Sequence, residues 1–250
     1  MTLRLHDVLV QAIVLDIEGT TTSVEFVYQI LFPYARARVK AYLAAHLSSA
    51  EVRADIAGLR EEHAADSRRG LDLSRLGNCS PEAQLDSIVA YIHWLMDQER
   101  KSTPLKSLQG KIWEEGYRTG ELRGQVFDDL PPALARWQGQ KKDICIFSSG
   151  SVLAQKLLFA HTSAGDLTRF IREYFDTTTG AKRDPQSYRR IAAVLQRQPS
   201  EILFVSDVTA ELDAARSAGL PTALCVRPGN PPQPAIHSHA VICTFDEIFP

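Results

Sequence analysis

Two acids directly follow the first apolar run of the chain. Residues 10–22 read VQAIVLDIEGTTT, which places Asp16 and Glu18 between the apolar residues and the turn that begins at Gly19. A short apolar run bounded by turn residues predicts a strand that is buried on both faces, as in a parallel sheet. Carboxylates at the end of such a strand are costly to bury unless a cation or hydrogen-bond donors compensate. The pair is therefore a candidate for chemistry, and the alternative is a strand that runs into a solvated acidic turn.

Other polar side chains follow later apolar runs. Ser148 and Ser149 end one run, Asp207 ends another, and Lys182 lies in the loop sequence GAKRDP. Because ligands of a parallel sheet gather at the carboxyl ends of its strands, we expect these residues to meet Asp16 there. The ammonium of Lys182 and the backbone amides at the start of the next helix suit an anion such as phosphate.

Carboxylates at the same edge suit a hard cation. Asp16, Glu18 and Asp207 could converge on Mg²⁺, which prefers oxygen ligands. A free carboxylate, a divalent cation and an anion site are together the equipment of phosphoryl transfer through an aspartyl-phosphate. Each part alone has a simpler interpretation, since a strand-end serine or Asp207 can cap the following helix and a loop lysine is usually solvated. The combination, in this order, is what indicates phosphoryl transfer.

The elements that must position these residues alternate between strand and helix. Apolar runs separated by helical patterns recur after residue 128, at 144–147, 202–205, 222–226 and 240–243. This alternation predicts an α/β protein with an open parallel sheet. Residues 23–128 show helical patterns with no convincing strand. We therefore predict a core domain formed by residues 1–22 and 129–250, with residues 23–128 inserted as a helical domain.

Several signals mark helix boundaries within the inserted segment. Pro33 is expected to end or kink the first helical segment. Ser48 with Glu51 has the form of a capping box. Ser80 and Thr103 each precede a proline, which predicts an N-cap residue followed by proline at the first helical position.

The composition excludes some classes of protein. The chain has 250 residues, 44% of them hydrophobic, and a net charge of −2, which argues against a nucleic-acid or membrane-surface partner. Its four cysteines, Cys79, Cys145, Cys225 and Cys243, are widely spaced, which favours a reduced, cytoplasmic protein. We expect no signal peptide and no transmembrane segment, because no apolar run is long enough.

The motifs resemble those of a known superfamily. DIEGT at Asp16, the strand-end Ser148, Lys182 and Asp207 resemble the four motifs of the haloacid dehalogenase (HAD) superfamily, and the inserted helices resemble its helical cap of the first type. The open parallel core is then Rossmann-like. Longer segments are similar to the enolase-phosphatases, or acireductone synthases, of methionine salvage: LDIEGTT, FVYQILFPYAR, LQGKIWEEGYRTGELRGQVFDD, IFSSGS and GAKRDPQSY.

This resemblance implies a role for each motif residue. Asp16 would be the nucleophile and a metal ligand. Glu18, where most HAD phosphatases have aspartate, would bind the metal through its backbone carbonyl, protonate the leaving alkoxide and then activate water. The phosphate would be held by Ser148, Ser149 and Lys182. Asp207 would complete the site of one Mg²⁺ ion per chain. A monomer is expected.

The resemblance also implies the substrate. It is 2,3-diketo-5-methylthiopentyl-1-phosphate, which is enolised and then dephosphorylated to the acireductone 1,2-dihydroxy-3-keto-5-methylthiopentene. Our hypothesis for the enolising base is Glu18, which is already placed for proton transfer. Candidates for binding the methylthio tail are Phe26, Tyr28, Phe32 and Trp113, although packing within the helical domain is the simpler interpretation of each.

Two further residues have more than one interpretation. Glu211 could hold a metal-bound water, orient Lys182, or be an ordinary acid at a helix start. His93 lies among core-facing residues and is expected to be structural.

Two other functions remain open from the sequence. One is another HAD phosphatase, or a phosphomutase, that acts on a different small phosphate ester and shares the four motifs. The other is a catalytically silent HAD-fold module that binds a partner. The presence of Asp16, Lys182 and Asp207 argues against the silent module.

Overall fold

The computed structural model describes residues 10–73, 76, 80–232 and 238–250. Cys79 and residues 1–9, where no signal peptide is expected, lie outside the described residues. Two units make up the chain: Met1–Gln29 with Arg123–Pro250, called here the sheet unit, and Ile30–Leu122, called here the helical unit. Within the described ranges, no helix is long and apolar enough to cross a membrane.

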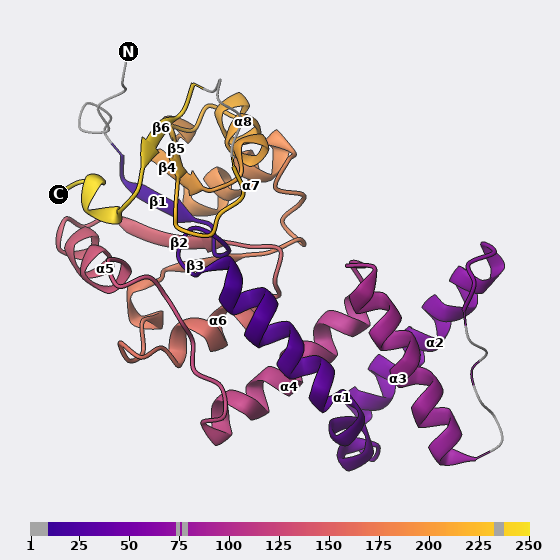
Figure 1. The fold of residues 1–250 in the computed structure, drawn as a ribbon. Coiled ribbons are helices and arrows are strands. Elements are labelled where there is room, and N and C mark those ends of the chain that lie inside the picture. Colours follow the sequence, from indigo (N-terminus) through magenta and orange to yellow (C-terminus); the bar gives the residue numbers. More distant parts are fainter. Residues whose placement is uncertain (1–9, 74–75, 77–79, 233–237) are drawn as a thin grey trace. The chain divides into compact units, whose positions relative to one another are not determined.

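A six-stranded parallel sheet forms the centre of the sheet unit (Figure 1). The strand order is β3-β2-β1-β4-β5-β6, so β1 lies between β2 and β4. The strands are β1 (Ala12–Leu15), β2 (Asp143–Phe147), β3 (Glu173–Phe175), β4 (Ile202–Ser206), β5 (Thr222–Cys225) and β6 (Ala240–Ile242). The predicted open parallel α/β sheet is confirmed.

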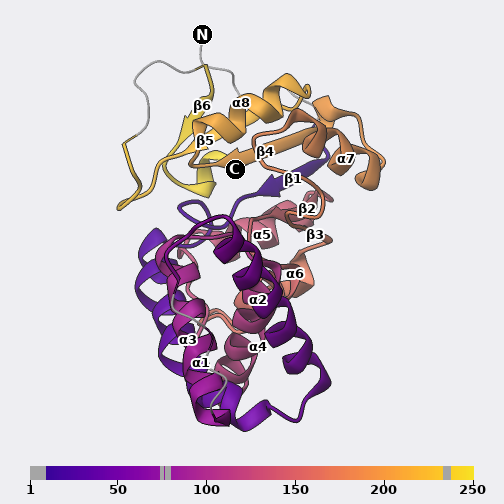
Figure 2. The same ribbon diagram turned by 90° about the vertical axis from the view of Figure 1, so that its right-hand side faces the viewer.

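Helices cover both faces of this sheet, as the turned view in Figure 2 shows. Helix α5 packs against β2 and α6 against β3, whereas α8 packs against β4, β5 and α7. The helices are α5 (Leu130–Gly139), α6 (Val152–Ala160), α7 (Pro185–Leu195) and α8 (Thr209–Ser217). The carboxyl-terminal strand ends remain at one edge, where the loops leave the sheet.

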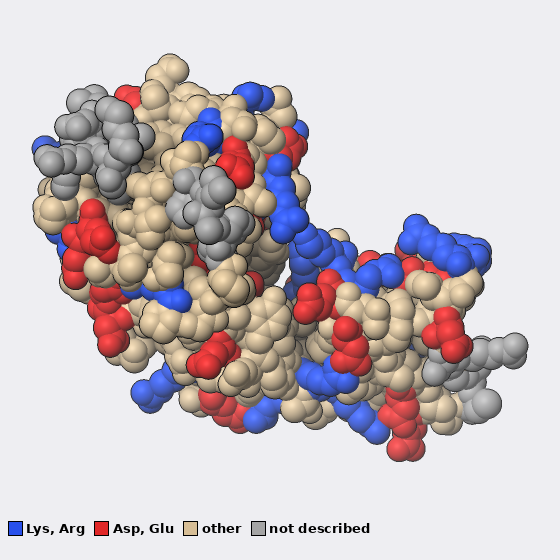
Figure 3. Space-filling model, turned by 45° about the horizontal axis from the view of Figure 1, so that its top comes forward, with Lys and Arg blue, Asp and Glu red and all other residues tan. Residues whose placement is uncertain are grey.

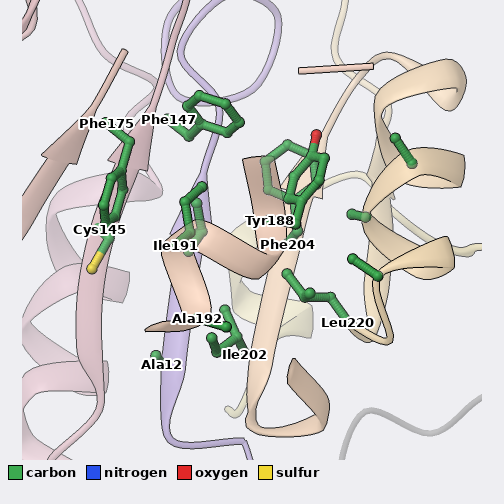
Figure 4. Close-up of a cluster of buried hydrophobic side chains, with 14 of the residues drawn as sticks. Ala12, Cys145, Phe147, Phe175, Tyr188, Ile191, Ala192, Ile202, Phe204 and Leu220 are labelled. Atoms are coloured by element: carbon green, nitrogen blue, oxygen red, sulfur yellow. The ribbon is translucent and has the colours of Figure 1, made fainter. Parts of the chain in front are cut away.

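The strands are buried on both faces, as the apolar run of β1 predicts. All four residues of β1 are 0% exposed. On one face, Phe147 and Phe204 pack against Tyr188 of α7. The ring centroid of Tyr188 lies 5.7 Å from that of Phe147 and 5.0 Å from that of Phe204. Figure 4 shows Tyr188 and Ile191 of α7 beside these strand residues. Burial of a side chain of this kind contributes about 2 kcal/mol, so the packing fixes α7 and the loop before it.

Two features differ from the prediction. The edge strand β3 was not expected, because its three residues, Glu173–Phe175, have no continuous apolar pattern. The units change at 29/30 and 122/123 rather than at 22/23 and 128/129. Backbone hydrogen bonds explain the second boundary, since Gly124 N donates to the His161 carbonyl and Phe127 N to the Thr21 carbonyl. These bonds hold residues 123–128 to the sheet unit.

Four helices make up most of the helical unit: α1 (Phe32–His46), α2 (Ala50–Arg68), α3 (Pro81–Asp97) and α4 (Thr103–Thr119). A π-helical segment, Phe26–Leu31, precedes α1, and Pro33 lies in the first turn of α1 rather than ending a helix. The predicted cap at Ser80 is confirmed, because its side chain accepts a hydrogen bond from Ala83 N.

Two predicted caps are wrong by one residue. The side chain that accepts a hydrogen bond from Val52 N belongs to Ser49, not Ser48. For α4 the capping side chain is that of Ser102, not Thr103. A run of hydroxyl residues before a helix leaves the sequence signal ambiguous, because each of them can cap.

A buried carboxylate, that of Asp66, joins three segments of the helical unit. Asp66 is 2% exposed, and it accepts hydrogen bonds from the Tyr91 hydroxyl at 2.8 Å and from Arg100 at 3.1 Å. Burial alone would raise the pKa of Asp66, but these hydrogen bonds and the Arg100 charge hold that pKa below its ordinary value. At pH values above the ordinary pKa of aspartate, ionised Asp66 therefore stabilises the fold. This contribution is lost as the pH falls through the lowered pKa that Asp66 has in the folded protein.

Asp66→Asn is expected to lower the free energy of unfolding by about 2 kcal/mol at neutral pH, since it weakens charge-assisted hydrogen bonds. Denaturant unfolding of both proteins, at neutral pH and at about pH 3, measures the difference. The difference should shrink at the lower pH, where the wild-type carboxyl is increasingly protonated. The control is Asp97→Asn, an exposed pair with Arg36, for which about 0.5 kcal/mol or less is expected. An equal Asp66→Asn effect at both pH values would contradict the account.

Candidate active site

The carboxyl ends of three neighbouring strands place the predicted site residues. Leu15 of β1 lies opposite Ile146 of β2 and Val205 of β4. The residues after these positions, which include Asp16 and Ser206, therefore emerge at the same edge of the sheet. The predicted gathering of strand-end polar residues follows from this parallel register.

Asp16 lies at the centre of a buried polar cluster. The residue is 4% exposed. The Oδ1 atom contacts Lys182 Nζ and accepts a hydrogen bond from Ile17 N at 2.6 Å. The Oδ2 atom lies 3.2 Å from Ser206 Oγ. These contacts hold the carboxylate from several sides and fix its rotamer.

Lys182 contacts two carboxylates. Its Nζ pairs with Asp16 and lies 3.2 Å from Glu211 Oε2. Burial alone would lower the pKa of Lys182, but the two neighbouring carboxylates outweigh burial and raise that pKa above its ordinary value. The Tyr188 hydroxyl donates a 2.7 Å hydrogen bond to the Lys182 carbonyl, so the packing of α7 on the sheet also fixes the lysine backbone. The contact between Lys182 Nζ and Glu211 Oε2 favours the interpretation that Glu211 orients Lys182.

Asp207 adds a third acid to this cluster. Burial, together with the charges of Asp16 and Glu211, raises the pKa of Asp207 to about 7. Three acids thus lie close together, and the Lys182 ammonium contacts two of them, Asp16 and Glu211. Such an excess of buried negative charge is what a divalent cation would neutralise, so the donor set fits the predicted Mg²⁺.

The side-chain ligands alone do not make up a metal site. Among the residues that the structure describes, no three His, Cys, Asp or Glu side chains are grouped so as to hold a metal ion. Glu18 is half-buried and takes part in an isolated backbone bridge with Thr22. A cation held by Asp16 and Asp207 therefore needs further oxygen ligands, and the family resemblance assigns one of them to the Glu18 backbone carbonyl.

The turn after Asp16 requires a glycine. Gly19 has φ +69°, and a Cβ at this position would lie 2.3 Å from Asp207 Oδ2 and 2.9 Å from Asn230 Oδ1. Any larger residue would therefore have to displace the carboxylate of Asp207 or the amide of Asn230, in addition to adopting a strained backbone.

We expect Gly19→Ala to reduce the predicted phosphatase activity by about 10²-fold, since displacements of about 1 Å at a reacting centre have effects of this size. The matched control is Gly229→Ala. Gly229 also has a positive φ, +86°, but a Cβ there meets nothing within 4 Å, so only backbone strain is added. Steady-state assays at saturating Mg²⁺ compare the two. Equal losses would mean that strain, and not displacement of Asp207, determines the effect.

The predicted phosphate-binding residues lie on the adjoining strand. Ser148 is buried at the end of β2, and its Oγ accepts a hydrogen bond from Gly150 N at 3.1 Å. Ser149 is exposed. Buried Gln155 of α6 donates 2.9 Å hydrogen bonds to the carbonyls of Gly150 and Phe175. This loop is thereby fixed, with backbone amides at the start of α6 that suit an anion.

Sequence reasoning assigned no role to two residues of the site. Ser206 Oγ lies within 3.2 Å of Asp16 Oδ2 and 3.1 Å from Glu211 Oε2, and so links two acids. Asn230 follows β5 and reaches the turn at Gly19. The position of Ser206 just before Asp207 was an available signal, whereas Asn230 in the sequence RPGNPP reads as an ordinary turn.

The candidates for binding the methylthio tail differ in exposure. Phe26 is 1% exposed, whereas Tyr28 is 48% exposed. Trp113 donates a 2.8 Å hydrogen bond to the Leu31 carbonyl, and its ring centroid lies 6.0 Å from that of Phe32. Phe32 and Trp113 thus pack on each other within the helical unit. His93 Nε2 lies 3.2 Å from the Arg36 carbonyl, which agrees with a structural role.

Comparison with known proteins decides the family. Residues 10–219 match the model for haloacid dehalogenase-like hydrolases. The chain is 50% identical over 239 residues to enolase-phosphatase E1 of Synechococcus elongatus, covering 96% of this chain and 98% of the relative. The chain belongs to the enolase-phosphatase E1 family of HAD-like hydrolases.

Further comparisons agree with this family. Enolase-phosphatase E1 of an Enterobacter species is 45% identical over 242 residues, covering 97% of this chain and 98% of the relative. The crystal structure of the UTR4 protein from Saccharomyces cerevisiae has a TM-score of 0.76 at 33% identity, over 95% of this chain and 99% of that one. The fold and family expected from the motifs of an enolase-phosphatase are therefore confirmed.

Proposed function

We propose that the chain is a bifunctional enolase-phosphatase that converts 2,3-diketo-5-methylthiopentyl-1-phosphate to 1,2-dihydroxy-3-keto-5-methylthiopentene and inorganic phosphate in methionine salvage. The observation that carries the proposal is the cluster of Asp16 and Asp207, at the ends of neighbouring strands, with Lys182 from a loop and Glu211 from α8. This cluster occurs in a chain of the enolase-phosphatase E1 family.

The phosphatase step uses two acids. The Asp16 carboxylate attacks phosphorus, the bond from phosphorus to the substrate oxygen breaks, and the leaving alkoxide takes a proton from Glu18. Glu18 then accepts a proton from the water that attacks the aspartyl-phosphate, which releases inorganic phosphate and regenerates Asp16. Lys182, Ser148 and Ser149 hold the phosphate oxygens during both displacements.

One Mg²⁺ ion per chain is part of the proposal. Asp16, Asp207 and the backbone carbonyl of Glu18 would hold it. When bound, the ion neutralises phosphate charge and polarises the diketone. The acidic cluster supports this assignment, because Lys182 pairs with Asp16 and Glu211 while the charges of these two acids disfavour ionisation of Asp207, which a cation would favour.

The enolising base is assigned to Glu18, as a hypothesis. Glu18→Gln keeps the size of the side chain but removes its proton acceptor, so enolisation of the diketo phosphate should slow by about 10²-fold or more. Ultraviolet absorbance of the enol follows this step. The control is Glu25→Gln, an exposed acid in the segment that follows the same strand. A Glu18→Gln protein that enolises at the wild-type rate would refute the assignment.

A substrate panel tests the function against its alternatives. Purified protein with Mg²⁺ should release phosphate from the diketo phosphate faster than from simple alkyl phosphates. Equal release from all esters would indicate a general HAD phosphatase. Transfer of the phosphoryl group to another hydroxyl group of the organic product, with little inorganic phosphate, would indicate a phosphomutase. No turnover of any ester would favour a silent binding module.

The roles of the two units, the location of the chain, its oligomeric state and its partners belong to the same proposal. The helical unit is assigned as the cap that selects the substrate tail, and the sheet unit as the catalytic core. The chain is assigned as a cytoplasmic monomer without nucleic-acid or membrane partners. Both signs of charge occur over the face in Figure 3, and Cys145 and Cys225 are buried free thiols, which support this assignment. Sedimentation at several concentrations tests the monomer.

A further inference from the structure

Asn230 ties a distant loop to the turn that carries the two catalytic acids. Its Nδ2 donates a 2.9 Å hydrogen bond to the Gly19 carbonyl. The same turn is closed by a 2.8 Å hydrogen bond from Gly19 N to the Thr22 carbonyl. The backbone of Gly19, one residue after Glu18, is therefore held on both its amide and its carbonyl side, and one of the two bonds comes from a side chain more than two hundred positions away.

The other end of the Asn230 amide has no partner. Its Oδ1 is buried and, in the described part of the chain, makes no hydrogen bond. A Cβ built on Gly19 would lie 2.9 Å from this Oδ1 and 2.3 Å from Asp207 Oδ2. Both oxygens therefore lie against the same side of Gly19 and near each other.

Two buried acceptor oxygens that lie near each other are unfavourable unless a hydrogen-bond donor or a cation contacts them. An unpaired buried amide oxygen is unfavourable, and native proteins rarely keep one without a ligand, ion or water. Asp207 is already a candidate ligand of the divalent cation, and amide and carboxylate oxygens together suit Mg²⁺ or a water bound to it.

We propose that Asn230 is a positioning residue of the cation site. Its Nδ2 fixes the Gly19 carbonyl, and its Oδ1 accepts from a water of the cation shell beside Asp207. The inference rests on the proposed cation site, but not on the identity of the phosphate ester. Outer-shell residues of this kind change metal affinity by about 10- to 100-fold when removed.

Mn²⁺ binding to metal-free protein, followed by electron paramagnetic resonance, tests the proposal without any substrate. Asn230→Ala should weaken Mn²⁺ binding by about tenfold or more. Asn230→Asp keeps Oδ1 and adds charge, so Mn²⁺ should bind at least as tightly as to the wild type. Asn230→Asp also loses the donor to Gly19, so its kcat at saturating Mg²⁺ should fall while its KM changes little.

Gly229→Ala is the matched control in the same loop, because a Cβ there meets nothing within 4 Å. A loss of Mn²⁺ affinity in Gly229→Ala equal to that in Asn230→Ala would overturn the proposal, since the effect would then belong to the loop as a whole. Wild-type affinity in a folded Asn230→Ala protein, or weakened affinity in Asn230→Asp, would overturn it as well. Wild-type protein that binds Mn²⁺ but produces no enol would contradict the proposed function alone.

Discussion

Asp16→Asn is expected to abolish phosphate release while leaving enolisation largely intact. The amide cannot attack phosphorus, and loss of a nucleophile lowers kcat by about 10⁴-fold or more. Enolisation requires a base and a polarised diketone but no covalent bond to Asp16. Ultraviolet absorbance and inorganic phosphate, recorded from the same reaction, therefore separate the two activities: the enol signal persists and phosphate does not appear.

Two controls define this result. Asp86→Asn removes an exposed acid that pairs with Lys40 in the helical unit, and it should leave both signals unchanged. Asp16→Ala excludes recovery of activity by slow deamidation of the introduced asparagine. If Asp16→Ala released phosphate at more than about one hundredth of the wild-type rate, another group would have to be the nucleophile.

Lys182→Met is expected to have the second-largest effect. The substitution removes the single ammonium from between Asp16 and Glu211. Phosphatase kcat/KM should fall by about 10³-fold, because a fixed positive charge near the transferred phosphoryl group is lost. The free energy of unfolding should fall by about 3–5 kcal/mol, since two buried carboxylates lose their partner.

Charge and shape can be separated at this position. Lys182→Arg keeps the charge in a larger, planar group, so it should recover most of the stability but little of the activity. Lys156→Met, an exposed lysine of α6, is the control for loss of a charge in the same unit. A Lys182→Met protein as stable as the Lys156→Met protein would mean that the lysine does not compensate the carboxylates.

The sequence predicts five of the six strands, including the edge strand β6, but not the edge strand β3. β1, β2 and β4 are continuous apolar runs because both of their faces are covered. β3 has one strand neighbour, β2, and its three residues are of mixed polarity. The apolar pattern cannot reveal so short a strand of mixed polarity, since pairing with β2, a tertiary contact, makes it a strand.

The site also contains residues that the sequence predicts and residues that it does not. Asp16, Lys182 and Asp207 could be predicted, because each ends a strand or lies in a recognisable loop motif. Ser206 and Asn230 could not, because serine and asparagine are ordinary turn and cap residues. Their roles depend on distances between segments far apart in the sequence, such as the 2.9 Å from Asn230 Nδ2 to the Gly19 carbonyl. Helix caps at Ser49 and Ser102 were missed by one residue for a local reason, the run of hydroxyl side chains before each helix.

The central claim is that one site enolises the diketo phosphate and then dephosphorylates it. A single-turnover reaction with excess protein and Mg²⁺, with enol absorbance and inorganic phosphate recorded on the same time axis, tests it most directly. The account predicts that the enol appears first, that phosphate follows at the rate at which the enol phosphate decays, and that chelator suppresses both. Phosphate release from the diketo phosphate with no enol before it would contradict the account.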